Sequence, residues 1–192
     1  MLALVGLGNP GKKHNNNRHN VGFMAIDCII ENYKLGAYKT KFQSKIITKT
    51  LNNTPLILLK PQTFMNLSGQ SLNHLVKFYK LNIENIIVFH DDLDLQFGVI
   101  KAKIGGSNGG HNGLSNIDSN IGTNYKRIRI GIGHPGNKNL VNNHVLSDFT
   151  KTENNIIKQL LNLISENIET IIKNKNISET ISEIFKTEEK KQ

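Results

Sequence analysis

Short apolar runs alternate along the chain with longer helical patterns, and this alternation restricts the fold more than any other feature of the sequence. The apolar runs are rich in Ile, Val and Leu, and runs of this kind between polar segments predict buried strands. Strands are expected at residues 2–7, 42–50, 56–59, 86–90, 99–104 and 127–132, and helices at 20–33, 68–79, 114–121 and 153–185, the last with a break near 174–176. The pattern predicts an α/β fold: a single domain with a twisted, mixed, mostly parallel sheet flanked by helices.

The length and composition of the chain agree with one domain. With 192 residues, the chain is expected to form a single domain over 1–192, with a C-terminal helical region at about 151–187. No apolar run reaches the roughly 18 residues of a membrane span, and the N-terminus lacks the order of a signal peptide. A cytoplasmic protein without membrane contact is therefore expected. The single cysteine, Cys28, excludes an internal disulfide and a cysteine zinc site.

The first predicted strand leads into Gly6-x-Gly8-x-x-Gly11, which has the spacing of a dinucleotide-binding turn. Such a turn requires a helix that begins at the third glycine, because the helix N-terminus binds the pyrophosphate. Gly11 is instead followed by a polar stretch, and the next helical pattern begins only near Asn20. The glycines therefore indicate a turn that leads the chain toward Arg18 and His19.

Positive charge is concentrated in the second half of the chain. The net charge of the whole sequence is +9. Between Leu95 and Ser147 the only acidic residue is Asp118, whereas the basic residues there are Lys101, Lys103, Lys126, Arg127, Arg129 and Lys138. A basic region of this kind suits a polyanionic partner such as RNA, and it is equally compatible with a lysine-rich, soluble surface.

Three segments have the composition of a functional site and lie at predicted strand ends or in glycine-rich loops. They are the loop that ends in Arg18-His19-Asn20, the segment 89–98 and the segment 105–113, which contains His111 and Asn112. An imidazole titrates near pH 6.5 and can act as a base on water if a carboxylate fixes its orientation. We therefore interpret His19 as the base and Asp91 as its partner.

Two further patterns leave alternatives open. His90, Asp91 and Asp92 offer metal ligands, but adjacent strand residues point to opposite faces, which argues against a shared ion. In the segment 61–69, Phe64 and Met65 suit either core packing or a wall for a bound peptide. Asn66 suits either a helix cap or an amide that binds a peptide backbone.

Six segments, taken in order, resemble bacterial peptidyl-tRNA hydrolase over roughly residues 2–150. They are "VGLGNPG", "RHNVGF", "KPQTFMNLSG", "HDDLDL", "GGHNGL" and "RIRIGIGHPG". The resemblance implies a monomeric α/β esterase that needs no metal or cofactor. It implies hydrolysis of the ester that joins a peptide to tRNA, with peptidyl-tRNA as the substrate. The helical tail from Lys151 matches only in general character.

The resemblance also implies roles for individual residues. His19 falls on the catalytic histidine of the family and Asp91 on the aspartate that orients it. The implied substrate-binding residues are Asn9, His14, Met65, Asn66, His111 and Asn112, and the implied contacts to tRNA phosphates are Lys103 and Arg129. The family usually has Tyr where this chain has His14. Two other functions stay open: a metal-dependent phosphoesterase, and an RNA-binding module without catalysis.

Overall fold

Successive residues of strand β1 (Leu2–Gly6) enter two separate hydrophobic cores. Leu2 and Leu4 belong to one buried cluster, and Ala3 and Val5 to the other. Successive side chains of a strand point to opposite faces of its sheet, so both faces of this sheet are covered. Coverage of both faces is typical of parallel strands in α/β proteins.

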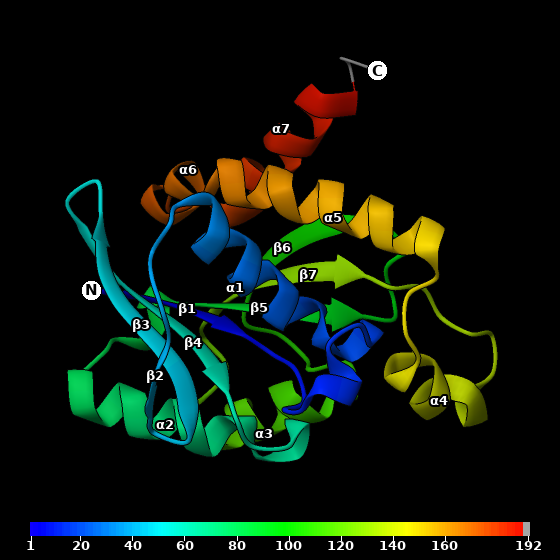
Figure 1. The fold of residues 1–192 in the computed structure, drawn as a ribbon, viewed down its shortest axis with the longest axis horizontal. Coiled ribbons are helices and arrows are strands. Elements are labelled where there is room, and N and C mark those ends of the chain that lie inside the picture. The colour runs from blue at the N-terminus through cyan, green and yellow to red at the C-terminus, as the bar shows by residue number, and fades with distance from the viewer. Residues whose placement is uncertain (190–192) are drawn as a thin grey trace.

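The computed structural model describes residues 1–189, which form one seven-stranded sheet (Figure 1). The other strands are β2 (Lys39–Lys41), β3 (Ser44–Leu51), β4 (Thr54–Pro61), β5 (Ile86–Asp92), β6 (Ile100–Ile104) and β7 (Lys126–Gly131). Their order in the sheet is β2-β3-β4-β1-β5-β7-β6. Strands β4, β1, β5 and β7 are mutually parallel, whereas β2, β3 and β6 add antiparallel edges. The predicted mixed α/β sheet is confirmed, with its parallel pairs confined to the four central strands.

The helices form a layer on each face of the sheet. They are α1 (Val21–Asn32), α2 (Ser68–Tyr79), α3 (Asn112–Ile121), α4 (Val141–Leu146), α5 (Lys151–Glu166), α6 (Ile168–Lys173) and α7 (Ile177–Glu189). Helices α1, α5 and α6 cover one face and α2 and α3 the other, as Figure 1 shows. Helix α7 packs on the edge strand β6, where the Ser178 hydroxyl donates to the Ala102 carbonyl at 2.8 Å.

Several predicted boundaries are corrected by local structure. The hairpin between β3 and β4 has a two-residue turn, because Asn52 and Asn53 adopt positive φ angles and the flanking residues pair as strands. Strand β2 and helix α4 have no counterpart in the prediction, since both are short and β2 is exposed along its whole length. The predicted helix 153–185 divides at Asn167 as well as at 174–176.

The glycine motif brings helix α1 close to the sheet. A three-residue 3-10 helix, η1 (Lys12–His14), follows Gly11, and α1 begins only at Val21. A Cβ atom on Gly6 would lie 2.3 Å from the carbonyl oxygen of Gly22, and one on Gly22 would lie 2.2 Å from that of Phe89. These contacts exclude any side chain. The motif therefore serves backbone packing, and no α-helix begins at Gly11 to bind a pyrophosphate.

Two expectations from composition can be compared with the fold. Cys28, the single cysteine, is half-buried in α1 and packs against the core. Within residues 1–189, no helix combines the length and the apolar character that crossing a membrane would require.

Candidate active site

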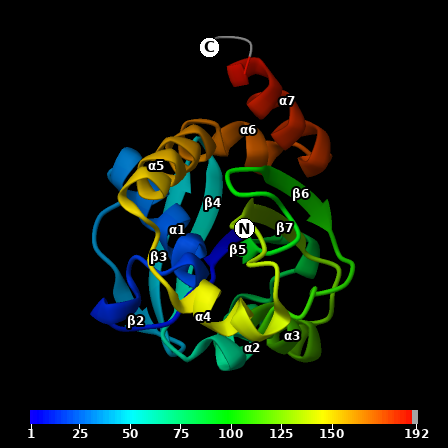
Figure 2. The same cartoon turned by 90° about the vertical axis from the view of Figure 1, so that its right-hand side faces the viewer.

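The carboxyl ends of the central strands lie together, and the chain forms a cavity of about 750 Å³ beside them. Its walls come from the segments that follow β1, β4 and β5, from the loop before α3, and from α4. Figure 2 looks onto this side of the molecule, with α4 toward the viewer. Ligands of open α/β sheets bind at this edge, so the cavity is the candidate active site.

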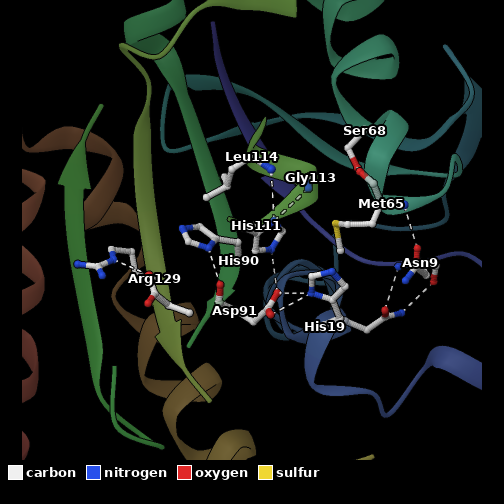
Figure 3. A network of polar contacts seen from close by, with 12 residues as sticks. Asn9, His19, Met65, Ser68, His90, Asp91, His111, Gly113, Leu114 and Arg129 are labelled. Atoms are coloured by element: carbon white, nitrogen blue, oxygen red, sulfur yellow. Dashed lines mark hydrogen bonds and ion pairs between the residues drawn. The ribbon is translucent and has the colours of Figure 1, made fainter. Parts of the chain in front are cut away.

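His19 and Asp91 form a buried pair in the cavity wall. Asp91 is the penultimate residue of β5, and His19 lies in the 3-10 helix η2 (Arg18–Asn20). Nδ1 of His19 lies 2.9 Å from each carboxylate oxygen of Asp91 (Figure 3). A carboxylate only accepts hydrogen bonds, so Nδ1 carries the proton and Nε2 of a neutral His19 carries the lone pair. The ring nitrogen Nε2 points away from Asp91 in Figure 3 and has no hydrogen-bond partner within residues 1–189.

The electrostatics of this pair favour a protonated His19. Burial opposes the imidazolium, but the charge of Asp91 and the hydrogen bond to it outweigh that cost and raise the pKa of His19 from its usual 6.5. Burial also opposes the charge of Asp91, yet its two imidazole neighbours, His19 and His111, hold the pKa of Asp91 well below its usual range. The pair can therefore receive a proton at Nε2 and stabilise the resulting cation.

Asn9 is held with its amide nitrogen available to the cavity. The backbone N–H of Asn9 donates to Oδ1 of Asn20, and Nδ2 of Asn20 donates to the Asn9 carbonyl, each at 2.9 Å. The N–H of Met65 donates to Oδ1 of Asn9 at 2.9 Å. Because Oδ1 is engaged, Nδ2 of Asn9 is the group that can donate to a bound molecule. Asn20 is a positioning residue that sequence reasoning missed, since an asparagine next to His19 gives no sign of a contact with Asn9.

The segment before α2 contributes a mixed wall. Met65 is buried and lines the cavity, whereas Phe64 lines it with 64% of its surface exposed. Core packing therefore explains Met65 but is wrong for Phe64. Asn66 is exposed at the cavity, and the N-cap of α2 is Leu67, which makes no side-chain cap. The alternative that Asn66 caps the helix is therefore wrong.

The loop before α3 contributes two of the predicted residues. Helix α3 begins at Asn112, two residues earlier than expected, and Asn112 lines the cavity with an exposed side chain. His111 is the N-cap of this helix, and its Nε2 lies 3.0 Å from Oδ1 of Asp91. The carboxylate of Asp91 thus lies between two imidazoles.

The basic residues divide into those at the cavity and those elsewhere. Lys103 and Arg129, the two implied phosphate contacts, line the cavity together with Lys138. Burial, followed by the nearby charges of Arg129 and Arg127, lowers the pKa of Lys103. Nε of Arg129 donates to Asp92 at 2.7 Å. Arg127 is fully buried in an ion pair with Asp118 and does not line the cavity.

His14 lies apart from the other predicted site residues. Its Nδ1 lies 2.8 Å from Oδ1 of Asn17, and the residue is not part of the cavity wall. The family resemblance implied a substrate contact for His14, at a position where the family usually has Tyr. His14 is the last residue of η1, whereas His19 lies in η2.

The residues proposed as metal ligands diverge as the strand geometry predicts. Nδ1 of His90 lies 2.6 Å from the carbonyl oxygen of Asp91, and Asp92 pairs with Arg129. A different group, His19, Asp91 and His111, has potential ligand atoms within 4.8 Å of one another. In this group the facing imidazole nitrogens already contact the carboxylate, so a cation would have to replace hydrogen bonds that hold the site together.

Three comparisons relate the chain to known proteins. The model of the family "Peptidyl-tRNA hydrolase" matches residues 3–192. A peptidyl-tRNA hydrolase of Bartonella henselae is 50% identical over 173 residues, which cover 90% of each chain. One of Mesorhizobium japonicum is 46% identical over 90% of this chain and 72% of its own length. The crystal structure of peptidyl-tRNA hydrolase from Acinetobacter baumannii superposes with a TM-score of 0.89 at 36% identity, covering 94% of each chain.

Proposed function

The chain belongs to the peptidyl-tRNA hydrolase family, and we propose that His19, oriented by Asp91, is the general base of its reaction. The family gives the activity, the release of peptide from peptidyl-tRNA. The assignment of the base rests on one observation: Nδ1 of His19 is bonded to a buried carboxylate while Nε2 points away from it, in a residue of the cavity wall. This arrangement fixes the tautomer that a base requires.

The bond that is hydrolysed is the ester between the C-terminal carbonyl of the peptide and the ribose 3′ oxygen of tRNA. Water loses a proton to Nε2 of His19 while its oxygen bonds to the carbonyl carbon. The tetrahedral intermediate then expels the ribose oxygen, which takes the proton back from the imidazolium. The products are the peptide acid and free tRNA, and Asp91 stabilises the cation that exists between the two steps.

Amide groups at the cavity are suited to the carbonyl oxygen and the peptide backbone. Nδ2 of Asn9 is free to donate because Oδ1 accepts from Met65. Asn112 is the second candidate donor for the oxygen that gains negative charge, since its side chain is exposed at the same cavity. Asn66 and Met65 would contact the peptide itself.

The cationic side of the cavity is suited to the tRNA. We propose that Lys103 and Arg129 contact its phosphates, because both line the cavity near the catalytic pair. His14, outside the wall, would reach only parts of the substrate that extend beyond the cavity. The enzyme is proposed to act as a monomer, since His19 and Asp91 come from the same chain and complete their pair within it.

Incubation with a peptidyl-tRNA and with a plain aminoacyl-tRNA, scored by the free tRNA produced, tests this function directly. We expect rapid release from the first and little from the second. The same assay after exhaustive chelation separates the esterase from a metal-dependent phosphoesterase, and activity is expected to survive. Loss of activity that a divalent ion restores, or binding of tRNA without release, would contradict the proposal.

A further inference from the structure

We propose that His111 is a positioning residue for this reaction: a neutral imidazole, fixed as its Nε2–H form by the start of α3, that holds Asp91 in place for His19. The inference rests on His19 acting as the base. It assigns His111 a task inside the protein in place of the substrate contact that sequence resemblance implies. Figure 3 shows His111 between Asp91 and the first turn of α3.

The hydrogen bonds of His111 determine its tautomer. The backbone N–H groups of Gly113 and Leu114 donate to Nδ1 at 3.1 and 3.3 Å. A ring nitrogen that accepts hydrogen bonds carries no proton, so the proton of the neutral ring is on Nε2. Nε2–H then donates to Oδ1 of Asp91 at 3.0 Å.

His111 has no ring nitrogen left for a substrate. Its side chain is only 9% exposed, and both nitrogens are occupied by protein groups. The ring also lies against the ring of His19, with centroids 4.8 Å apart. Since His19 gains a proton during the reaction, a second cation at that distance would oppose the step. A His111 locked in the neutral form avoids this repulsion.

The titratable groups around His111 are few among residues 1–189. His19 faces it from η2, Asp91 bonds to it from β5, and the His90 ring meets it edge-on with centroids 5.3 Å apart. Burial lowers the pKa of His90 to about 3, so His90 is neutral. Asp92, next along β5, is paired with Arg129. Among these neighbours, Asp91 is therefore the charged group in direct contact with His111.

Two substitutions separate the two contacts of the ring. In His111→Asn, Oδ1 is as many bonds from Cβ as Nδ1, so it can cap α3, but no group reaches Asp91. In His111→Gln, Nε2 is as many bonds from Cβ as the lost Nε2–H, so it can donate to Asp91 while the cap is lost. A carboxylate that loses a donor attracts the His19 proton more strongly.

The pH profile of kcat/KM is the main readout. The acidic limb of this profile is the range in which kcat/KM falls as the pH drops. For His111→Asn we expect this limb to move to higher pH by about 0.5 unit, with KM within about twofold of the parent. His111→Gln should keep the parental limb and should unfold at a lower temperature than His111→Asn. His74→Asn is the control, because this histidine lies on the exposed side of α2 and does not line the cavity. Its acidic limb should not move.

An increase in KM alone, with the limb unmoved in His111→Asn, would overturn the proposal in favour of a substrate contact. Equal shifts in the Asn and Gln variants would overturn it as well. Nitrogen NMR of the unmodified protein without substrate gives an answer that needs no variant to fold. A His111 protonated on Nδ1 between about pH 6 and 8 would refute the assigned tautomer. That result is independent of turnover, so it is distinguishable from a failure of His19 as the base.

Discussion

At the scale of single residues, the carboxylate of Asp91 organises the site. It is 3% exposed and accepts from His19 and His111, which come from segments far apart in the sequence. The cost of burying this charge is offset by the two imidazole donors. The same contacts decide which nitrogen of each ring carries a proton. One buried charge thus fixes the protonation of two neighbours.

The first prediction concerns the pH dependence of the enzyme. A base works only when neutral, and the pKa of His19 is raised from 6.5, so kcat/KM should fall as the pH drops through a value above 6.5. Asp91→Asn removes the charge that raises this pKa. We therefore expect its acidic limb at lower pH and a kcat reduced on the order of 10²-fold or more. Initial rates between about pH 5.5 and 8.5 check both statements, and an unmoved limb would count against the pairing.

At the scale of elements, the success of sequence reasoning follows the strength of local signals. Helix α2 begins and ends as predicted, at Ser68 and Tyr79, because an amphipathic pattern covers its full length. Helix α4 was missed because its six residues are too few to show a period. The break at Asn167 was missed because apolar residues continue on both sides of it. The roles of His19 and Asp91 could be inferred from the chemistry of their side chains. The contact of His111 with Asp91 and that of Asn20 with Asn9 depend on tertiary structure.

A junction between two distant segments illustrates what local patterns do not carry. Arg18, next to His19, donates through Nη2 to both carboxylate oxygens of Glu153, at 2.9 and 2.7 Å. Through Nη1 it donates to the Asp148 carbonyl at 2.6 Å and to the Ser147 hydroxyl at 2.8 Å. Glu153 also completes a capping box with Thr150 at the start of α5. The segment that carries His19 is therefore hydrogen-bonded to the segment between α4 and α5 and to the first turn of α5.

The second prediction tests this junction. Glu153→Gln leaves the buried guanidinium of Arg18 without its counter-charge, so the free energy of unfolding should fall. The expected loss is about 1–3 kcal/mol; the partial exposure of Glu153 limits its size. Lys173→Gln is the control, since the Lys173–Glu169 pair is 3.7 Å long and its lysine is 57% exposed. That change should cost less than about 1 kcal/mol. Urea unfolding measures the free energy of unfolding of both variants, and equal losses in the two would argue that Arg18 and Glu153 do not stabilise the fold through this contact.

At the scale of the whole molecule, the sheet brings catalytic and cationic residues to one edge. His19 and Asp91 lie on one side of the cavity wall, and Lys103, Arg129 and Lys138 belong to the same cavity. The sequence predicts a basic region but does not separate its members. Only folding distinguishes Arg127, which is buried against Asp118, from Arg129 at the cavity.

The third prediction concerns the electrostatics of tRNA binding. If Lys103 and Arg129 contact phosphates, each replacement by Ala should weaken binding to tRNAs of different sequence alike. It should also reduce the slope of log affinity against log salt by about 0.7–0.9 per lost contact. Titrations at several salt concentrations measure this slope, with Lys101→Ala, outside the cavity wall, as the control. An unchanged slope in the double variant would mean that these cations serve only solubility.

The turnover of His19→Asn tests the central claim most directly. Asn removes Nε2 as a base while it keeps a polar side chain of similar size, so the fold and tRNA binding should persist. We predict a fall in kcat of about 10²- to 10⁴-fold with affinity for tRNA within about twofold of the parent. Near-normal turnover by a folded His19→Asn protein would contradict the assignment of His19 as the base.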